Sequence, residues 1–255
     1  MAGTKSVVDF IASSANQAHC NTCSLASLCI PIALNSDDMD ELDKVIKRGR
    51  PIQKGELLFQ QGDPFKAVYA IRTGAVKTYT IASTGEEQIT GFHLASELVG
   101  LSGYSSDTYP LTAKALETTT VCELPLNQLD ELCNEIPALR KQIMRTMGGE
   151  IRQDQQMMLQ LSQKSADERV AYFLMDLSNR FERRGYSPKA FRLAMSRVDI
   201  GNYLGLAVET VSRIFTRLQK NGLIETEGKE ITFTNMNAIR ELAGNPSIED
   251  SCKHK

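Results

Sequence analysis

The sequence lacks the features of a membrane or secreted protein. No run of eighteen or more apolar residues occurs in the 255 residues, and no sustained apolar segment follows residues 1–6. These absences predict a cytoplasmic protein with no targeting segment and no membrane partner.

Residue sets typical of enzymes are also missing. The three histidines, at positions 19, 93 and 254, are scattered, and no Ser-His-Asp set, phosphate-binding glycine loop or carboxylate pair stands out. His19 beside Cys20 leaves an enzyme with cysteine–histidine chemistry as an alternative. Because a lone histidine is far more often structural or solvated, we expect a protein that is not an enzyme.

Charge is nearly balanced overall but uneven along the chain. The formal net charge is −2, whereas residues 164–220 hold 11 Lys or Arg against 6 Asp or Glu, which gives +5 there and −7 elsewhere. This asymmetry suggests a DNA-binding module joined to an acidic front half. A solvated basic helix face is the alternative.

The cysteines are clustered rather than spread. They lie at positions 20, 23, 29, 122, 133 and 252. Cytosolic thiols are kept reduced, so clustering points to metal or redox chemistry. Cys20, Cys23 and Cys29 lie within ten residues, and no single helix face can present all three to one ion. Cys122 or Cys133 could supply a fourth thiolate, and four thiolates suit either a structural zinc or an iron-sulfur cube.

The N-terminal half of the chain changes from a helical pattern of apolar residues to a pattern of short strands. Residues 36–49 have the periodicity of a short amphipathic helix. Short apolar, β-branched runs follow at 57–59, 68–71, 76–81 and 88–93, separated by turn signals at 55, 62–64, 74 and 84–85. Strands at this spacing, continuing to about residue 124, predict a compact antiparallel barrel or jelly roll.

Helical periodicity returns near residue 126, and Pro137 suits a helix N-terminus. A heptad seam then predicts a parallel coiled-coil dimer; it comprises Met144, Met147, Ile151, Asp154, Met158 and Leu161. In a symmetric dimer the two Asp154 carboxylates would face and repel each other. We therefore expect this seam to form only a weak dimer interface. Alternatively, Asp154 points outward from a frayed register.

Residues 167–184 form another predicted helix, and a helix-turn-helix pattern follows it. Ser196 and Asp199 suit a helix cap, Gly205 a tight turn, and residues 208–221 a second helix. Residues 223–226 and 231–234 have the pattern of a hairpin wing. A three-helix structural subdomain with a polar face is the alternative.

The second helix carries two stripes. One is apolar, and the other presents Glu209, Ser212, Arg213 and Thr216. Arg213 suits guanine, Glu209 suits cytosine, and Ser212 can contact a base edge or a thymine methyl. Arg217 and Lys220 are better placed for phosphate. The pattern predicts a helix that reads double-stranded DNA.

Several motifs together resemble one family. They are Cys20-x2-Cys23-x5-Cys29-Ile-Pro, the run Gln-Ile-Thr-Gly-Phe-His-Leu at 88–94, Asp-Ile-Gly-Asn-Tyr-Leu-Gly-Leu at 199–206 and Glu-Thr-Val-Ser-Arg at 209–213. The chain resembles, over nearly its whole length, the fumarate and nitrate reduction regulators (FNR), the anaerobic switch of the catabolite-activator (CRP/FNR) superfamily. The resemblance implies an α+β fold with an N-terminal jelly-roll barrel of the cyclic-nucleotide-binding type, a long dimerisation helix and a C-terminal winged helix-turn-helix.

The resemblance also implies a cofactor and a switch. One [4Fe-4S] cluster per subunit would be held by residues matching the family's ligands, Cys20, Cys23, Cys29 and Cys122, whereas Cys133 and Cys252 have no such role. In the family the intact cluster promotes homodimerisation and DNA binding. Oxygen converts it to [2Fe-2S], and the protein returns to monomers. The implied protein is an oxygen-sensing transcription regulator that activates or represses.

Partners and domains follow from the same resemblance. Glu209, Ser212 and Arg213 would read palindromic TTGAT-type half-sites about one helical turn apart. The loop around Ile81 and Gly85 would contact RNA polymerase, although Glu86 stands where Asp is familiar in the family. The implied divisions are a cluster-binding segment at 1–30, a sensory barrel at 31–135, a dimerisation helix at 136–164, a DNA-binding domain at 165–244 and a flexible tail at 245–255.

Of two rival functions, the first is discounted and the second stays open. A cyclic-nucleotide-gated regulator would need a barrel Arg for the phosphate, yet no Lys or Arg occurs between Lys77 and Lys114. A zinc-stapled repressor without a sensing role is the second rival.

Overall fold

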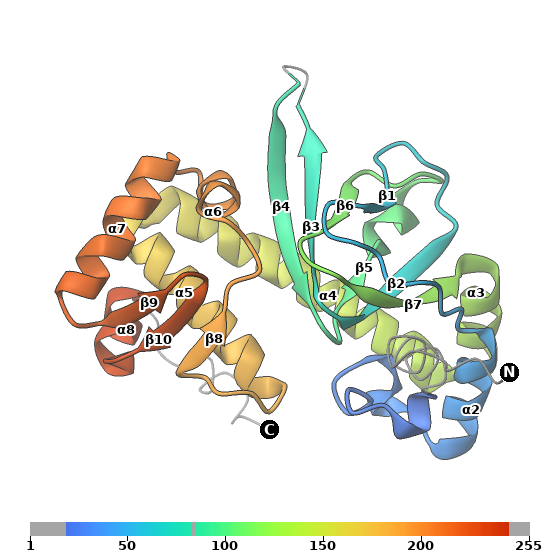
Figure 1. Ribbon diagram of the computed structural model, residues 1–255. Helices are drawn as coiled ribbons and strands as arrows, with labels where there is room; N and C mark the ends of the chain where they lie inside the picture. Colours follow the sequence, from blue (N-terminus) through green and yellow to red (C-terminus); the bar gives the residue numbers. More distant parts are fainter. Residues whose placement is uncertain (1–18, 83–84, 245–255) are drawn as a thin grey trace, which may run out of the picture. The chain divides into compact units, whose positions relative to one another are not determined.

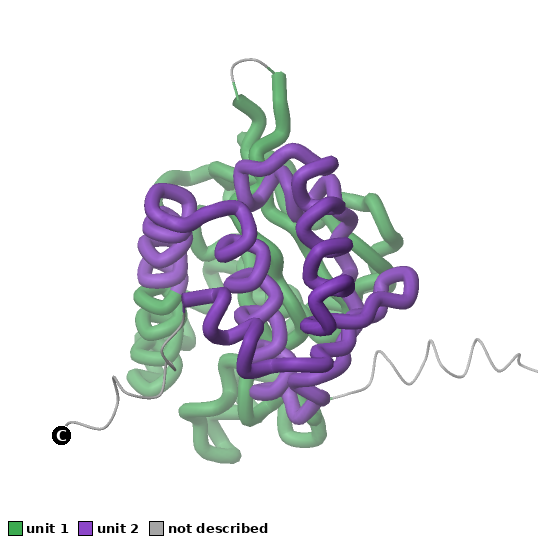
Figure 2. Tube along the Cα trace, turned by 90° about the vertical axis from the view of Figure 1, so that its left-hand side faces the viewer, with its two compact units in different colours: residues 1–149 green, residues 150–255 purple. Residues whose placement is uncertain are grey.

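A computed structural model describes residues 19–82 and 85–244 (Figure 1). The chain forms two compact units, residues 1–149 and 150–255 (Figure 2), and the division falls within one long helix. Cys252 and the proposed tail at 245–255 lie outside the described residues.

From residue 19 onward, the first unit has two short 3-10 helices, η1 (Cys20–Thr22) and η2 (Ile30–Ala33), and then the helix α2 (Ser36–Val45). The Asn35 side chain caps α2 by accepting the Asp38 N–H at 2.8 Å. The helix ends at Val45 rather than near Gly49, because Ile46 is extended and the Lys47 backbone pairs with Glu123. The sequence therefore predicted this helix correctly but placed its end too late.

A jelly-roll barrel follows, as the sequence predicted. Its strands are β1 (Leu57–Phe59), β2 (Ala67–Thr73), β3 (Ala75–Ile81), β4 (Glu87–Leu94), β5 (Leu98–Val99), β6 (Thr112–Ala115) and β7 (Thr120–Pro125), with η3 (Leu101–Ser105) after β5. One sheet has the order β1-β6-β3-β4 and the other β5-β2-β7, with antiparallel pairing throughout. At the β2–β3 turn Gly74 has φ +84°, and a Cβ there would lie 2.5 Å from Thr119 Oγ1, so only glycine fits.

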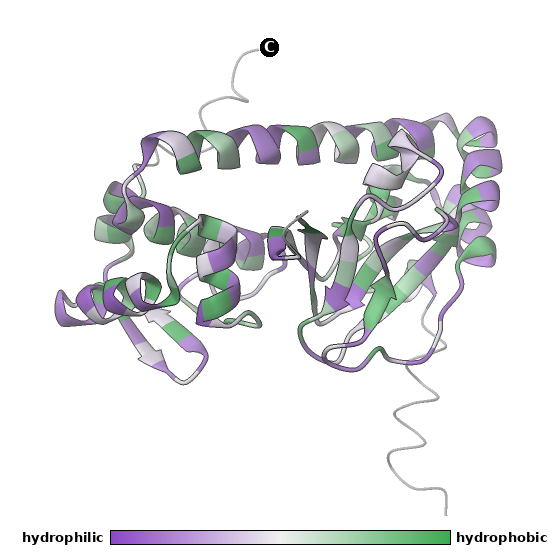
Figure 3. Cartoon of the chain, turned by 90° about the horizontal axis from the view of Figure 1, so that it is seen from above, coloured by the Kyte–Doolittle hydropathy of each residue, from purple (hydrophilic) through white to green (hydrophobic). Residues whose placement is uncertain are grey.

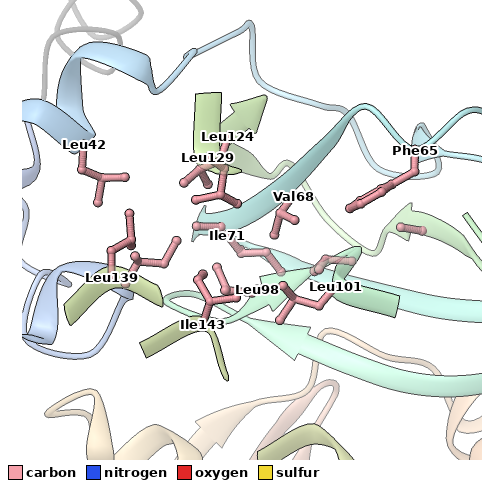
Figure 4. Packing of buried hydrophobic residues seen from close by; sticks show 14 of the residues in the cluster. Leu42, Phe65, Val68, Ile71, Leu98, Leu101, Leu124, Leu129, Leu139 and Ile143 are labelled. Carbon is pink, nitrogen blue, oxygen red and sulfur yellow. The ribbon is translucent and has the colours of Figure 1, made fainter. Parts of the chain in front are cut away.

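The core of this unit joins the barrel to three helices (Figure 4). Leu42 comes from α2, Ile71 from β2, Leu124 from β7, Leu129 from α3 (Leu126–Glu135) and Leu139 from α4 (Pro137–Gln163). All five are almost fully buried, and each such side chain contributes about 1.5–3 kcal/mol of hydrophobic stabilisation. This packing places α2 and β7, which carries Cys122, in one hydrophobic core.

The helix α4 is 27 residues long and begins at Pro137, as predicted. Apolar turns recur between polar ones along its length (Figure 3). In the single chain Met144 is 64% exposed, Ile151 59% and Met158 70%, whereas Met147 packs against the barrel core. Most of the predicted seam is thus an exposed apolar stripe.

The second unit is a winged helix-turn-helix. It contains α5 (Ala166–Arg183), β8 (Ala190–Arg192), α6 (Arg197–Leu204), α7 (Val208–Lys220), β9 (Ile224–Glu227), β10 (Glu230–Phe233) and α8 (Met236–Leu242). Its antiparallel sheet has the order β8-β10-β9, so the wing has a third strand that the sequence analysis missed. The analysis also missed α8.

Local chemistry fixes the turn between α6 and α7. Ser196 and Asp199 form a reciprocal capping box at the start of α6, and Gly205 ends the helix at φ +63°. A Cβ on Gly201 would lie 2.6 Å from the Leu206 carbonyl oxygen, so this glycine permits the close turn.

Within residues 19–82 and 85–244, no helix is both long and apolar enough to cross a membrane.

Candidate cysteine site and nucleic-acid interface

Four cysteines line one cavity of the first unit. Cys20 lies in η1, Cys23 follows it, Cys29 precedes η2, and Cys122 lies on β7, where it pairs with Ala70 of β2. The other lining side chains are mainly apolar and include Leu25, Ala26, Ile30, Leu42, Ile71 and Leu124. Cys133 lies on α3, packs against the core and does not line this cavity. Of the two fourth-ligand candidates, the fold therefore brings Cys122 to the other three.

The segment between Cys20 and Cys29 is a series of tight turns. The Cys23 N–H donates to the Cys20 carbonyl at 3.2 Å, the Ala26 N–H to the Cys23 carbonyl at 3.0 Å, and the Cys29 N–H to the Leu25 carbonyl at 2.9 Å. A turn-rich loop can direct three side chains to one place, which a single helix face cannot. We call residues 19–29 the cysteine loop.

Burial dominates the electrostatics of these thiols. It raises the pKa of Cys20 to about 12, with a further contribution from the neighbouring Asp43, and it raises the pKa of Cys29 to about 12. Burial also raises the pKa of Cys122, against the opposing charges of Arg48 and Arg72. A bound metal favours thiolate, so binding at this site would release protons.

The donor set suits a thiolate-bound cofactor. Four sulfur donors in an apolar wall are what iron-sulfur clusters and structural zinc require. Within the part of the chain that the structure describes, no three His, Cys, Asp or Glu side chains are gathered closely enough to hold a single metal ion. The four thiols thus share a cavity without being closed around one ion.

One carboxylate ties the cysteine loop to α2. Asp43 accepts the Cys20 N–H at 2.9 Å, lies 2.6 Å from His19 Nδ1 and pairs with Arg48. Burial alone would raise the pKa of Asp43, but its bonds with His19, the Cys20 N–H and Arg48 outweigh that and hold it at about 2. Asp43 and Arg48 could not be predicted from the sequence, because the separation of 23 residues between Cys20 and Asp43 gives no sign of a contact.

All five predicted DNA contacts lie exposed on α7. Its other face buries Val211, Ile214, Phe215 and Leu218, so Glu209, Ser212, Arg213, Thr216 and Arg217 face outward. Ser212, Arg213, Thr216, Arg217, Lys220 and Asn221 line one surface hollow. The arrangement presents hydrogen-bonding groups and positive charge on one helix face, which is how a recognition helix meets a major groove.

Arg217 is already paired in the protein. Its Nε donates to Asp167 Oδ1 at 3.0 Å, and its Nη2 contacts the same oxygen. Asp167 lies in the first turn of α5, fifty residues away in sequence. The sequence predicts that Arg217 contacts phosphate but gives no sign of this carboxylate.

Two further predicted sites are exposed. Ile81 is 47% exposed at the end of β3, and Gly85 has φ +84° and donates its N–H to the Ala82 carbonyl. Asp154 is exposed on α4, and partial desolvation by its neighbours raises its pKa.

Comparisons with known proteins agree with this architecture. The cyclic nucleotide-binding domain family matches residues 50–135, and the Crp-like helix-turn-helix domain family matches residues 168–242. The transcriptional activator protein anr of Pseudomonas aeruginosa is 63% identical over 228 residues, or 89% of this chain and 93% of that protein. The fumarate and nitrate reduction regulatory protein of Escherichia coli K12 is 52% identical over 240 residues, or 94% and 96%. The structure of FixK2 from Bradyrhizobium japonicum has a TM-score of 0.73 at 31% identity and covers 80% of this chain and 100% of that one.

A barrel of this type joined to a Crp-like helix-turn-helix defines a DNA-binding transcription regulator, and not an enzyme. More closely, the chain belongs to the FNR/Anr family of CRP/FNR regulators. Both the predicted fold class and the family resemblance are confirmed.

Proposed function

We propose that this regulator senses oxygen through a [4Fe-4S] cluster, one per subunit, held by Cys20, Cys23, Cys29 and Cys122. The observation that carries the proposal is the convergence of these four thiols, from the cysteine loop and from β7, on one largely apolar cavity. When bound, such a cluster would supply an oxygen-labile centre, the [4Fe-4S] form being lost to [2Fe-2S]. The names of the relatives agree with a role in anaerobic gene regulation.

The thiol arrangement favours a cluster over zinc. A tetrahedral zinc with Zn–S distances of about 2.3 Å needs its sulfurs within roughly 3.8 Å of one another. A four-iron cube is a larger body, and each thiolate binds a separate iron. A lone three-cysteine loop with a remote fourth thiol on β7 fits this larger cofactor better than zinc, whose sites more often use two paired Cys-x2-Cys arms.

The chain's residues would couple this site to dimerisation. The cysteine cavity belongs to the same unit as the start of α4, whose Leu139 and Ile143 are buried in the barrel core. We place the dimer interface on the α4 stripe: Met144, Met147, Ile151, Asp154, Met158 and Leu161. Repulsion between two Asp154 carboxylates would keep pairing marginal, so a modest stabilisation of the first unit could shift the equilibrium.

DNA binding is a family property, and we propose its finer details. Two α7 helices, one per protomer, would read TTGAT-type half-sites, with Glu209, Ser212 and Arg213 at base edges. Thr216 would lie on the same groove-facing stripe, and Arg217 and Lys220 would lie nearer the phosphates. The exposed turn around Ile81 and Gly85 would contact RNA polymerase.

We also propose the domain assignment stated above: a cluster-binding segment at 1–30, a sensory barrel at 31–135, a dimerisation helix at 136–164, a DNA-binding domain at 165–244 and a tail at 245–255. As a regulator of transcription, the protein would act in the cytoplasm, where bacterial DNA lies.

Visible absorption of protein purified without air tests the sensing role. The proposal predicts a brown protein that binds a TTGAT palindrome, and it predicts that air replaces the visible absorption of the four-iron cluster by the different spectrum of [2Fe-2S] and removes the binding. A colourless protein that binds the same DNA equally well with and without air would refute the cluster and favour a zinc-stapled repressor.

A further inference from the structure

The cysteine loop is attached to α2 at a small number of points. Asn21 of the loop donates to Asp40, whose position is exposed. The stronger attachment is Asp43, whose side chain is only 11% exposed and which receives the backbone N–H of Cys20 as well as His19. A bond from an N–H to a carboxylate is stronger than a bond between neutral groups. Asp43 therefore fixes the backbone at the first cysteine itself.

Arg48 extends this attachment toward the fourth cysteine. Its guanidinium pairs with Asp43, and its side chain is only 15% exposed. The backbone of Lys47, next to Arg48, exchanges two hydrogen bonds of 2.9 Å with Glu123, the neighbour of Cys122 on β7. Arg48 Nε is buried and has no hydrogen-bond partner among the described residues. A buried cation next to several thiols offers charge compensation if those thiols become thiolates.

Asp43 and Arg48 thus connect the two chain segments that carry the cysteines. Cys20, Cys23 and Cys29 lie on the loop, and Cys122 lies on β7. We propose that Asp43 is a positioning residue: it docks the cysteine loop onto α2 and, through Arg48, holds it against Cys122, so that the four-thiol cavity is assembled before a cofactor binds. The proposal rests on the cluster function for its purpose, but the docking itself is a property of the metal-free chain.

Hydrogen–deuterium exchange of the full-length, metal-free, reduced protein tests the docking. Asp43→Asn keeps the size of the side chain and removes its charge, and Asp43→Ala also removes the acceptor. We expect amide exchange at Cys20 to rise by about tenfold or more in Asp43→Ala, and by less in Asp43→Asn. Asp37→Asn, an exposed change on the same helix, should leave exchange in the loop unchanged.

A second measurement asks whether docking prepares the cavity for iron. Each protein is loaded anaerobically with iron and sulfide, and the loss of iron to a chelator is followed. Asp43→Asn should lose iron several-fold faster than the parent and Asp37→Asn. If Asp43→Ala unfolds the barrel, Asp43→Asn still gives both readouts, because it changes charge without opening a cavity.

The outcomes separate the two proposals. Unchanged exchange over residues 19–29 in both Asp43 variants overturns the docking role. Faster exchange with normal iron retention overturns the claim that docking prepares the site. Faster exchange in a chain whose parent never takes up iron supports docking and refutes the cluster function instead.

Discussion

Removing the Asp154 carboxylate should strengthen dimerisation of the metal-free protein. Asp154 lies on the exposed stripe of α4, with Ile151 59% and Met158 70% exposed on either side of it in the heptad. In a parallel dimer the two carboxylates would face each other across the seam. At a separation of about 8 Å and an effective dielectric constant of roughly 20–80, their repulsion amounts to about 0.5–2 kcal/mol. Asp154→Ala should therefore tighten the dimer by between about 2- and 30-fold.

The pH dependence has a definite sign. Burial already raises the pKa of Asp154 in the protomer, and a facing carboxylate would raise it further in the dimer. A group whose pKa is higher in the dimer than in the monomer stabilises the dimer at low pH, and that stabilisation is lost as the pH rises through the raised value. The parent should therefore dimerise more tightly as the pH falls, whereas Asp154→Ala should show little such change.

Sedimentation equilibrium in air, at several concentrations and at two pH values, measures both effects. Gln156→Ala, on the outer face of the same heptad, is the matched control and should behave like the parent. Equal dimer constants for the parent and Asp154→Ala at both pH values would refute the opposed-carboxylate seam and favour an Asp154 that points outward.

Further predictions concern the ligands, the DNA face and the turn glycine. Cys122→Ser should abolish anaerobic DNA binding while Cys133→Ser should not, as gel-shift titration would measure; equal phenotypes would defeat the ligand assignment. Arg213→Ala should flatten base preference at one half-site position in a binding-site selection, whereas a uniform loss over all sequences would mark Arg213 as a phosphate contact. Asp167→Asn releases Arg217, so the slope of log DNA-binding constant against log salt concentration should steepen by about one. Glu182→Gln, near the far end of α5, is the control. An unchanged slope in Asp167→Asn would exclude Arg217 from the phosphates. Gly201→Ala sets a Cβ against the Leu206 carbonyl and should cost about 1–3 kcal/mol in thermal unfolding, whereas Gly149→Ala, with open space around it, should cost nothing and gain up to about 1 kcal/mol.

Local signals made much of the fold predictable from the sequence. The capping box at Ser196 and Asp199, the left-handed Gly205 and the two stripes of α7 each depend on residues within one or two turns. Pro137 and the heptad likewise specified α4. The missed elements, β8 and α8, are three and seven residues long and carry too little periodicity to stand out. Their existence depends on pairing with β10 and packing against α5.

The cysteine site was predictable only in part. The close spacing of Cys20, Cys23 and Cys29 identified three ligand candidates. The residues alone left the choice between Cys122 and Cys133 as the fourth ligand open. Cys122 reaches the cavity because β7 pairs with β2 in a register that sets Cys122 opposite Ala70. Asp43 and Arg48 were invisible for the same reason: their roles arise from the docking of α2 beside a loop more than twenty residues away in sequence. Spacing identifies local ligands, whereas tertiary register selects the distant ones.

The most direct test of the central claim is an assay of iron, acid-labile sulfide and zinc in protein purified without air. The proposed cluster predicts four iron and four sulfide per chain, with zinc absent. Zinc in place of iron, or no metal in a protein that still binds its palindrome as a dimer, would contradict the claim.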